Sequence, residues 1–193
     1  MKKGFSLIEM IVALGVFSGA ALIGVSALLS LTVSQRKAMA IQSAYDNMRF
    51  GVEVISKDLR TGDIYHCSSA GNLTLPQDCP PGVNDADPLH QSITFLNSSG
   101  QTVRYRFSTC GASGCIQKTV NGGTDEQITG DDVNIQDLRF FVTGSRPSVA
   151  EIADGDLPFQ AVITIMASGE AGSGKSKSQF SLETTVTQRT VRK

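Results

Sequence analysis

Charge is what the first part of this 193-residue chain lacks. From Met10 to Ser34 there is no Asp, Glu, Lys, Arg, His or Pro. Without proline nothing breaks a helix here, and without charge that helix is apolar on every side. Roughly 20 apolar residues suffice to cross a bilayer as a helix, so the segment is long enough to span a membrane.

Histidine and clustered basic residues are also scarce, which bears on the function class. Only His66 and His90 occur and no Cys-x-x-Cys pair is present, which argues against a zinc site. Gly-x-Ser-x-Gly is absent, so no nucleophile elbow indicates a hydrolase. The basic residues are scattered, so there is no strong nucleic-acid signal. We expect a protein that is not an enzyme and has no cofactor or metal.

Carboxylates that could bind calcium are present only in weak patterns. Asp131-Asp132 and Asp154-Gly155-Asp156 could donate oxygens, but neither has EF-hand spacing. We expect both pairs to lie in solvated loops. The chain has 17 basic and 18 acidic residues, and removal of Lys2 and Lys3 would leave 15 against 18, a net charge of −3.

The residues before the apolar run indicate how it is used. Lys2 and Lys3 favour a cytoplasmic N-terminus, which would place everything after about Gln35 outside the inner membrane. A secretory signal is cleaved after its apolar region and discarded. Here the plausible processing point, Gly4, precedes the apolar run, so cleavage would leave that run on the mature chain.

Glu9 is the one carboxylate close to this run. Inside a membrane segment it would cost about 2–4 kcal/mol and would mark a functional partner. If the chain is cut after Gly4, the new α-amine belongs to Phe5, one helical turn from Glu9. Glu9 of one subunit could neutralise the Phe5 amine of a neighbour and set the register of a helical stack. Gly15-x-x-x-Gly19 permits close helix contact but alone also fits a simple anchor.

The sequence Gly4-Phe5-Ser6-Leu7-Ile8-Glu9, with its basic leader and long apolar helix, resembles the class III signal of type IV pilins and type II secretion pseudopilins. The resemblance implies that a prepilin peptidase cleaves between Gly4 and Phe5, that Phe5 becomes N-methylated and that Glu9 aids assembly. It implies other pilin or pseudopilin subunits, the inner-membrane assembly platform and, before assembly, membrane lipid as partners. The expected location is the inner membrane, then an extracytoplasmic filament.

A second helical pattern follows the apolar run. Apolar residues recur at alternating spacings of four and three, at Ile41, Tyr45, Met48, Val52, Ile55 and Leu59. Thr61-Gly62 supplies a stop. The sequence therefore predicts one helix from Phe5 to Arg60, about 80 Å long at ~1.5 Å per residue. We expect a β domain to pack on the apolar stripe of its second half.

From Gly62 onward, short alternating apolar runs replace the helical pattern. The predicted strands are Ser92–Leu96, Thr102–Phe107, Ile116–Val120, Val133–Val142, Gln160–Ala167 and Gln179–Thr190. They predict an α+β fold, in which the long N-terminal helix packs on a C-terminal antiparallel β-sheet domain. The expected divisions are a leader (1–4), an assembly half (5–34) and an amphipathic half (35–61) of the helix, and one extracytoplasmic domain (62–193).

The later sequence resembles a narrower group. Ile93-Thr94-Phe95, Tyr105-Arg106-Phe107, Leu138-Arg139-Phe140 and Thr187-Gln188-Arg189 look like the strands of minor pilins of the PilW and pseudopilin J groups. The stretch from Phe50 to Arg60, followed by Cys67, is similar to PilW-type sequences as well. This resemblance implies a minor subunit.

Four cysteines lie in the part expected outside the membrane. They are Cys67, Cys79, Cys110 and Cys115. An even count in an oxidising compartment favours disulfides, and three connectivities are possible. Proximity in the sequence favours Cys67–Cys79 and Cys110–Cys115, each of which would contribute roughly 2–3 kcal/mol.

The stretch from Gly169 to Ser176 matches the P-loop expression letter for letter. In a nucleotide site Lys175 would contact the β/γ-phosphates and Ser176 a magnesium ion, and a helix would follow the loop. Instead Gln179–Val186 is rich in β-branched residues and predicts a strand. We therefore expect a Gly/Ser hairpin loop and no nucleotide site.

The sequence thus predicts a structural fibre subunit, a minor pilin or pseudopilin. The alternative is a membrane-anchored extracytoplasmic binding or adhesion module that never enters a filament. Whether such a filament would serve motility, secretion, DNA uptake or adhesion is open at this point.

Overall fold

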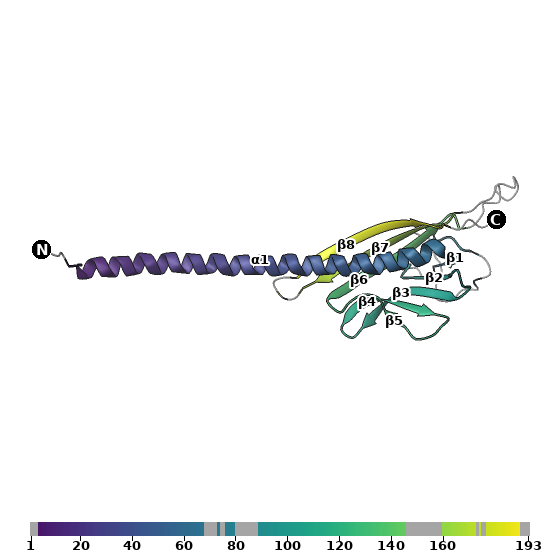
Figure 1. Ribbon diagram of the computed structural model, residues 1–193, viewed down its shortest axis with the longest axis horizontal. Helices are drawn as coiled ribbons and strands as arrows, with labels where there is room; N and C mark the ends of the chain where they lie inside the picture. Colours follow the sequence, from purple (N-terminus) through teal and green to yellow (C-terminus); the bar gives the residue numbers. More distant parts are fainter. Residues whose placement is uncertain are drawn as a thin grey trace.

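One uninterrupted helix organises the molecule. The computed structural model describes residues 4–67, 73, 76–79, 89–145, 160–172, 174 and 177–189. Helix α1 (Leu7–Thr61) is 55 residues long, and only its second half lies against the β domain (Figure 1). The stretch Leu7–Met39, in which every residue is exposed, is here called the stem. The predicted single helix is confirmed, but it begins at Leu7 and not at Phe5, and it ends at Thr61 with Gly62 as the C-cap.

The strands form two antiparallel sheets. The first, sheet A, has the order β1-β2-β3-β4-β5 and the second, sheet B, the order β6-β7-β8. The strands are β1 (Asp63–His66), β2 (Ser92–Leu96), β3 (Thr102–Cys110), β4 (Ser113–Val120), β5 (Glu126–Gln127), β6 (Val133–Thr143), β7 (Val162–Ala171) and β8 (Ser178–Thr187). The α+β fold is therefore confirmed, with two sheets where the sequence pattern suggested one.

Six strands were predicted, and all six are present with small shifts of their ends. The predicted strand Gln179–Thr190 ends in the structure at Thr187, and Thr190 lies outside the described residues. Strands β1 and β5 were missed. β5 is two polar residues long, and β1 is a four-residue strand whose Ile64 has a positive φ of 53°. Neither is long enough to show a clear alternation of apolar residues.

The apolar stripe of α1 faces the domain core. Its buried members are Ala44, Met48, Gly51, Val52, Ile55 and Leu59. The prediction was wrong for Tyr45, which is 44% exposed, while Ile41 is only half-buried. The ring of Tyr45 lies 6.2 Å from that of Phe180 at the end of the domain, so it covers the core from outside. Ala44 takes the buried position instead.

Asp58 ties α1 to sheet A. The Tyr105 hydroxyl and the Lys118 ammonium each donate to Asp58 Oδ2 at 2.7 Å. Burial raises the pKa of Tyr105 well above its ordinary range, and the bond to Asp58 adds to the effect. The polar contact therefore holds the helix in one rotation over the sheet.

The two sheets are joined at Gly114 and by a disulfide. The Gly114 N–H donates to Asn134 Oδ1 at 2.7 Å, and a Cβ at Gly114 would lie 1.9 Å from the Ile135 carbonyl oxygen. Cys67 follows β1 and is bonded to Cys79, whose backbone forms a bridge with Val142 of β6.

The second disulfide, Cys110–Cys115, cross-links β3 and β4. Both predicted pairings are therefore present, and none of the described cysteines is free.

Candidate functional site

The start of α1 places the predicted processing residues outside the helix and Glu9 inside it. Residues 4–6 are not helical, and Ser6 is the N-cap in an extended conformation. The Ser6 carbonyl accepts hydrogen bonds from the N–H groups of Glu9 at 3.1 Å and Met10 at 3.2 Å. Gly4 and Phe5 are both exposed, Phe5 at 81%, so the peptide bond between them is accessible.

Glu9 lies in the first turn of α1. A carboxylate there interacts favourably with the helix dipole, whereas a positive α-amine at the same end opposes it. Glu9 has no ion-pair partner among the residues that the structure describes. Its carboxylate is therefore available to a group outside this chain.

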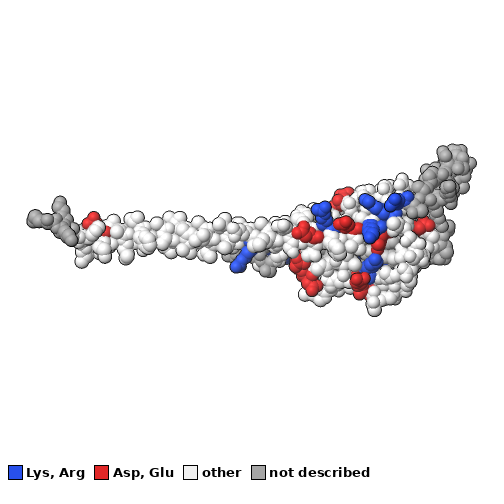
Figure 2. Space-filling view, in the orientation of Figure 1, with Lys and Arg blue, Asp and Glu red and all other residues white. Residues whose placement is uncertain are grey.

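The stem is an exposed apolar rod. Ile8, Leu14 and Leu22 are each about 70% exposed, and the face seen in Figure 2 shows almost no charge between the first turn and the domain. Helix α1 is long and apolar enough to cross a membrane, with a mean hydropathy of 2.2 in its most apolar window and none of that window buried. Such a surface marks a contact with lipid or with other protein.

Four hydroxyl groups in the stem are satisfied by the helix itself. Ser18 donates to the Leu14 carbonyl at 2.8 Å, and Ser26 donates to the Ile23 carbonyl at 2.8 Å. The hydroxyls of Thr32 and Ser34 make equivalent bonds to earlier carbonyls. The stem can therefore enter an apolar environment without leaving these donors unpaired.

Glycines leave open notches along the stem. A Cβ placed on Gly15, Gly19 or Gly24 would meet no other atom within 4 Å. No contact within the described part of the chain explains these glycines, and they leave room for the backbone of a second helix to approach. The Gly15-x-x-x-Gly19 pair lies on the exposed part of α1, where a second helix can reach it.

The P-loop match falls on a strand and a turn. Gly169, Glu170 and Ala171 belong to β7, and Ala171 pairs with Ser178 at the start of β8. The predicted hairpin is confirmed, because a strand and not a helix follows the turn. Lys175 and Ser176 lie outside the described residues.

The predicted acidic loop residues have structural contacts. Asp132 accepts hydrogen bonds from Ser43 at 2.5 Å and Asn47 at 2.6 Å, which attaches the loop before β6 to α1. Asp131 accepts a hydrogen bond from Gln127 at 3.0 Å. In the described part of the chain there is no group of three or more His, Cys, Asp or Glu that could hold a metal ion. Asp154-Gly155-Asp156 lies outside that part.

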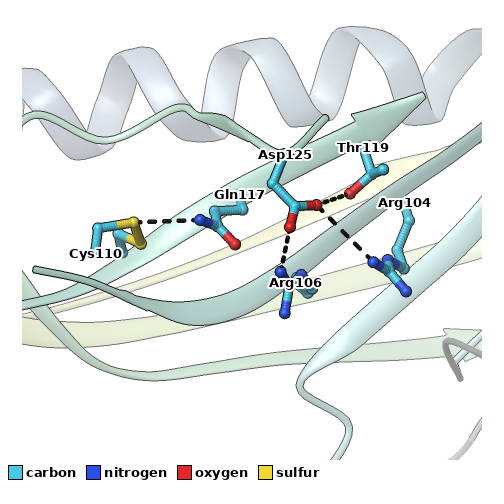
Figure 3. Close-up of polar contacts among 7 residues, drawn as sticks. Arg104, Arg106, Cys110, Gln117, Thr119 and Asp125 are labelled. Atoms are coloured by element: carbon cyan, nitrogen blue, oxygen red, sulfur yellow. Dashed lines mark hydrogen bonds and ion pairs between the residues drawn. A yellow bond between two sulfur atoms is a disulfide. The ribbon is translucent and has the colours of Figure 1, made fainter. Parts of the chain in front are cut away.

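Sequence reasoning missed one polar cluster on the outer face of sheet A (Figure 3). Asp125 accepts from Arg106 at 2.5 Å and lies 3.9 Å from Arg104. The Thr119 hydroxyl and then Arg106 lower the pKa of Asp125 through their hydrogen bonds. The spacing of Arg104 and Arg106 in a strand could have shown that both lie on one face. The cluster holds the connection between β4 and β5 in place. Ion pairs at a protein surface add little to the free energy of unfolding, so its contribution to stability is small.

Comparison with known proteins gives no relative. No protein-family model matches the chain, no curated protein matches it, and no solved structure matches it. The features of this chain that bear on function are therefore its exposed stem and the first turn of α1.

Proposed function

We propose that this chain is a structural subunit, of the minor pilin or pseudopilin type, of a type IV pilus or a related type II secretion filament. A prepilin peptidase cleaves between Gly4 and Phe5, and the new Phe5 amine is methylated. Before assembly the mature subunit lies in the inner membrane with its domain on the outer side. The assembly platform then moves it into the filament, where its stem packs against other stems.

The free stem carries this proposal. The domain buries one stripe of the second half of α1 and leaves Leu7–Met39 without cover. In the membrane lipid covers that surface, and in a filament the stems of neighbouring subunits replace the lipid. Lipid tails are as apolar as the stem, so the transfer of the stem from lipid to a bundle of stems gains nothing from hydrophobic burial alone. The open glycines favour the bundle through close packing of helices, and Glu9 favours it through a polar pair.

The pairing of Glu9 with a neighbouring amine favours the assembled state over the membrane-bound one. A carboxylate in an apolar surrounding costs about 2.5–3.5 kcal/mol on insertion scales. Cleavage after Gly4 creates a positive amine on Phe5, which opposes the dipole of its own helix. When Glu9 of one subunit lies beside the Phe5 amine of its neighbour, both costs fall together. The pair also fixes how far one stem is shifted along the next.

Replacement of Glu9 tests the proposal. Glu9→Ala and Glu9→Gln, expressed in a host with an active assembly system, should reach the membrane and be processed like the wild type. Their amount in sheared filaments should fall at least about tenfold, which corresponds to a loss of about 1.4 kcal/mol or more. Glu53→Ala, at an exposed carboxylate in the second half of α1, is the matched control and should assemble normally.

Two outcomes would count against the proposal. Normal incorporation of both Glu9 variants would remove the role given to this carboxylate. If the chain stays in the membrane, absent from filaments, and works equally well with Glu9→Ala, the anchored binding or adhesion module is the better account.

A further inference from the structure

A basic recess lies where the domain meets the stem. It is lined by Lys37 and Ile41 of α1 and by Glu170, Lys177, Ser178 and Gln179 of the β7–β8 hairpin, and its volume is about 540 Å³. Strand β8 begins on the side of the domain toward the stem and runs away from it (Figure 1). The hairpin that resembles a P-loop in sequence thus contributes to a site of a different kind.

The recess holds more positive than negative charge. Lys177 forms an ion pair with Glu170, whose Oε1 also accepts from Gln179 at 3.4 Å. The bond from Lys177 lowers the pKa of Glu170, so this carboxylate stays ionised. Glu170 is 8% exposed, but the Lys177 side chain is 53% exposed. One carboxylate therefore positions a lysine that still faces outward, and Lys37 adds a second cation.

A neutral donor in the recess is left without a partner. Ser178 Oγ is buried and makes no hydrogen bond with any residue that the structure describes. A buried hydroxyl without a partner is energetically unfavourable. A lysine ammonium has three donors, so Lys177 can bond a second anion while it keeps Glu170. The free donors all suit an oxygen-rich anion such as a phosphodiester.

The position along α1 indicates where that anion comes from. The uncharged run ends at about Ser34, and Lys37 follows three residues later, about 5 Å along the axis at ~1.5 Å per residue. If the stem crosses the membrane as proposed, Lys37 lies at headgroup depth on the outer side. Basic residues are normally enriched on the cytoplasmic side, so cations at the outer end of the span are unfavourable. An anionic lipid beside these cations would compensate their charge.

We propose that the basic recess binds the phosphodiester headgroup of an anionic phospholipid in the membrane that the stem crosses. This inference rests on the membrane span of the proposed function. Lys37 and Lys177 contact the phosphate oxygens, and the hydroxyl of half-buried Ser178 turns outward to donate to one of them. The bound lipid holds the domain against the membrane surface before assembly, and the subunit has to release it on extraction.

The absence of tryptophan from the chain permits a clean test. Ser181→Trp places a single reporter on an exposed position of β8, close to the recess but not in its lining. The full chain is placed in nanodiscs of phosphatidylcholine, alone or with about a third phosphatidylglycerol, each with a trace of lipid labelled on its headgroup with dansyl. Energy transfer from tryptophan to dansyl reports how close the domain lies to the headgroups.

Transfer should be higher in the discs with phosphatidylglycerol, and about 0.5 M salt should remove the difference. Lys37→Gln with Lys177→Gln should abolish the rise, since two cations near an anionic surface together favour binding about thirtyfold. Lys57→Gln with Arg189→Gln changes the net charge equally at two exposed positions outside the lining and should keep the rise.

Three results would overturn the inference. Equal transfer in both kinds of disc would show that the domain does not respond to anionic lipid. Equal loss in the two double variants would show that only net charge matters. Lipid-independent transfer, together with loss of filament incorporation in the Lys37/Lys177 variant, would assign the recess to an acidic neighbouring subunit. A chain that fails to enter the discs at all would contradict the membrane span itself.

Discussion

The two halves of α1 have the same backbone and opposite surroundings. Ile23 in the stem is 72% exposed, whereas Ile55 in the second half is completely buried. The difference comes from sequence periodicity, because apolar residues surround the first half and occupy one stripe of the second. A one-sided stripe is satisfied by the chain's own domain, but a fully apolar rod requires lipid or other copies. The comparison separates the residues that fold the domain from those that are free to make contacts outside the chain.

The largest expected effect is at Ile55. Ile55→Ala should reduce the free energy of unfolding of the domain by about 2–5 kcal/mol, because it leaves a cavity between α1 and the sheets. Ile23→Ala removes the same atoms from the stem and should leave domain stability within about 0.5 kcal/mol. Denaturant unfolding of the full chain in detergent micelles, followed by tyrosine circular dichroism, measures both. Equal losses of unfolding free energy in the two variants would show that the stem stabilises the domain as much as the second half of α1 does.

The next effect concerns the disulfide that joins the sheets. Cys67→Ser with Cys79→Ser opens a loop with a sequence separation of 12 and should cost about 3 kcal/mol. Loss of Cys110–Cys115, with a separation of 5, should cost about 2 kcal/mol. Thermal unfolding of the variants measures this order, and alkylation without reductant should find no free thiol among these four cysteines.

A smaller effect is expected from Tyr105. Its raised pKa means that its contribution to stability is complete below the ordinary tyrosine pKa of about 10 and is lost as the pH rises above that value. Tyr105→Phe removes the bond to Asp58 and should cost about 1–2 kcal/mol at neutral pH.

The same variant should lose less stability than the wild type between about pH 9 and 11. Unfolding curves across that range test the pair, with Tyr45→Phe as the control for loss of an exposed phenol. An unchanged alkaline slope in Tyr105→Phe would show that another group titrates.

The smallest expected effect is a gain. A Cβ at Gly51 would lie 3.7 Å from Ile128 and 3.8 Å from Thr129, which is ordinary contact. Gly51→Ala should therefore raise domain stability by about 0.5–1 kcal/mol through its helix propensity. The same substitution at Gly19 should leave the domain unchanged and weaken assembly, because it fills an open notch in the stem. Unfolding curves and filament yields separate the two sites.

Much of the fold was predictable because its signals are local. The missing charges before Ser34 and the stripe through Met48, Ile55 and Leu59 define α1 without any tertiary information. The longer strands, such as β3 and β6, alternate clearly enough to be found. Their division into two sheets depends on the close contact of Gly114 with Ile135, which the chain order alone does not contain.

Predictability of the candidate sites follows the same rule. Gly4, Phe5 and Glu9 lie close together in the sequence, so the motif that they form can be recognised without a structure. The basic recess was not predicted, because Lys37 and Lys177 come together only when β8 packs beside α1. Asp125 was missed for the same reason, since it lies in the connection between β4 and β5 and its arginine partners lie on β3.

Mass spectrometry of the mature N-terminus shows whether the chain is processed between Gly4 and Phe5. The chain, purified from cells with an active prepilin peptidase, should begin at Phe5 and carry one added methyl group. That result would make the stem the N-terminal part of the mature protein, with Glu9 four residues after a modified amine. An intact start at Met1 in the same cells would contradict the account.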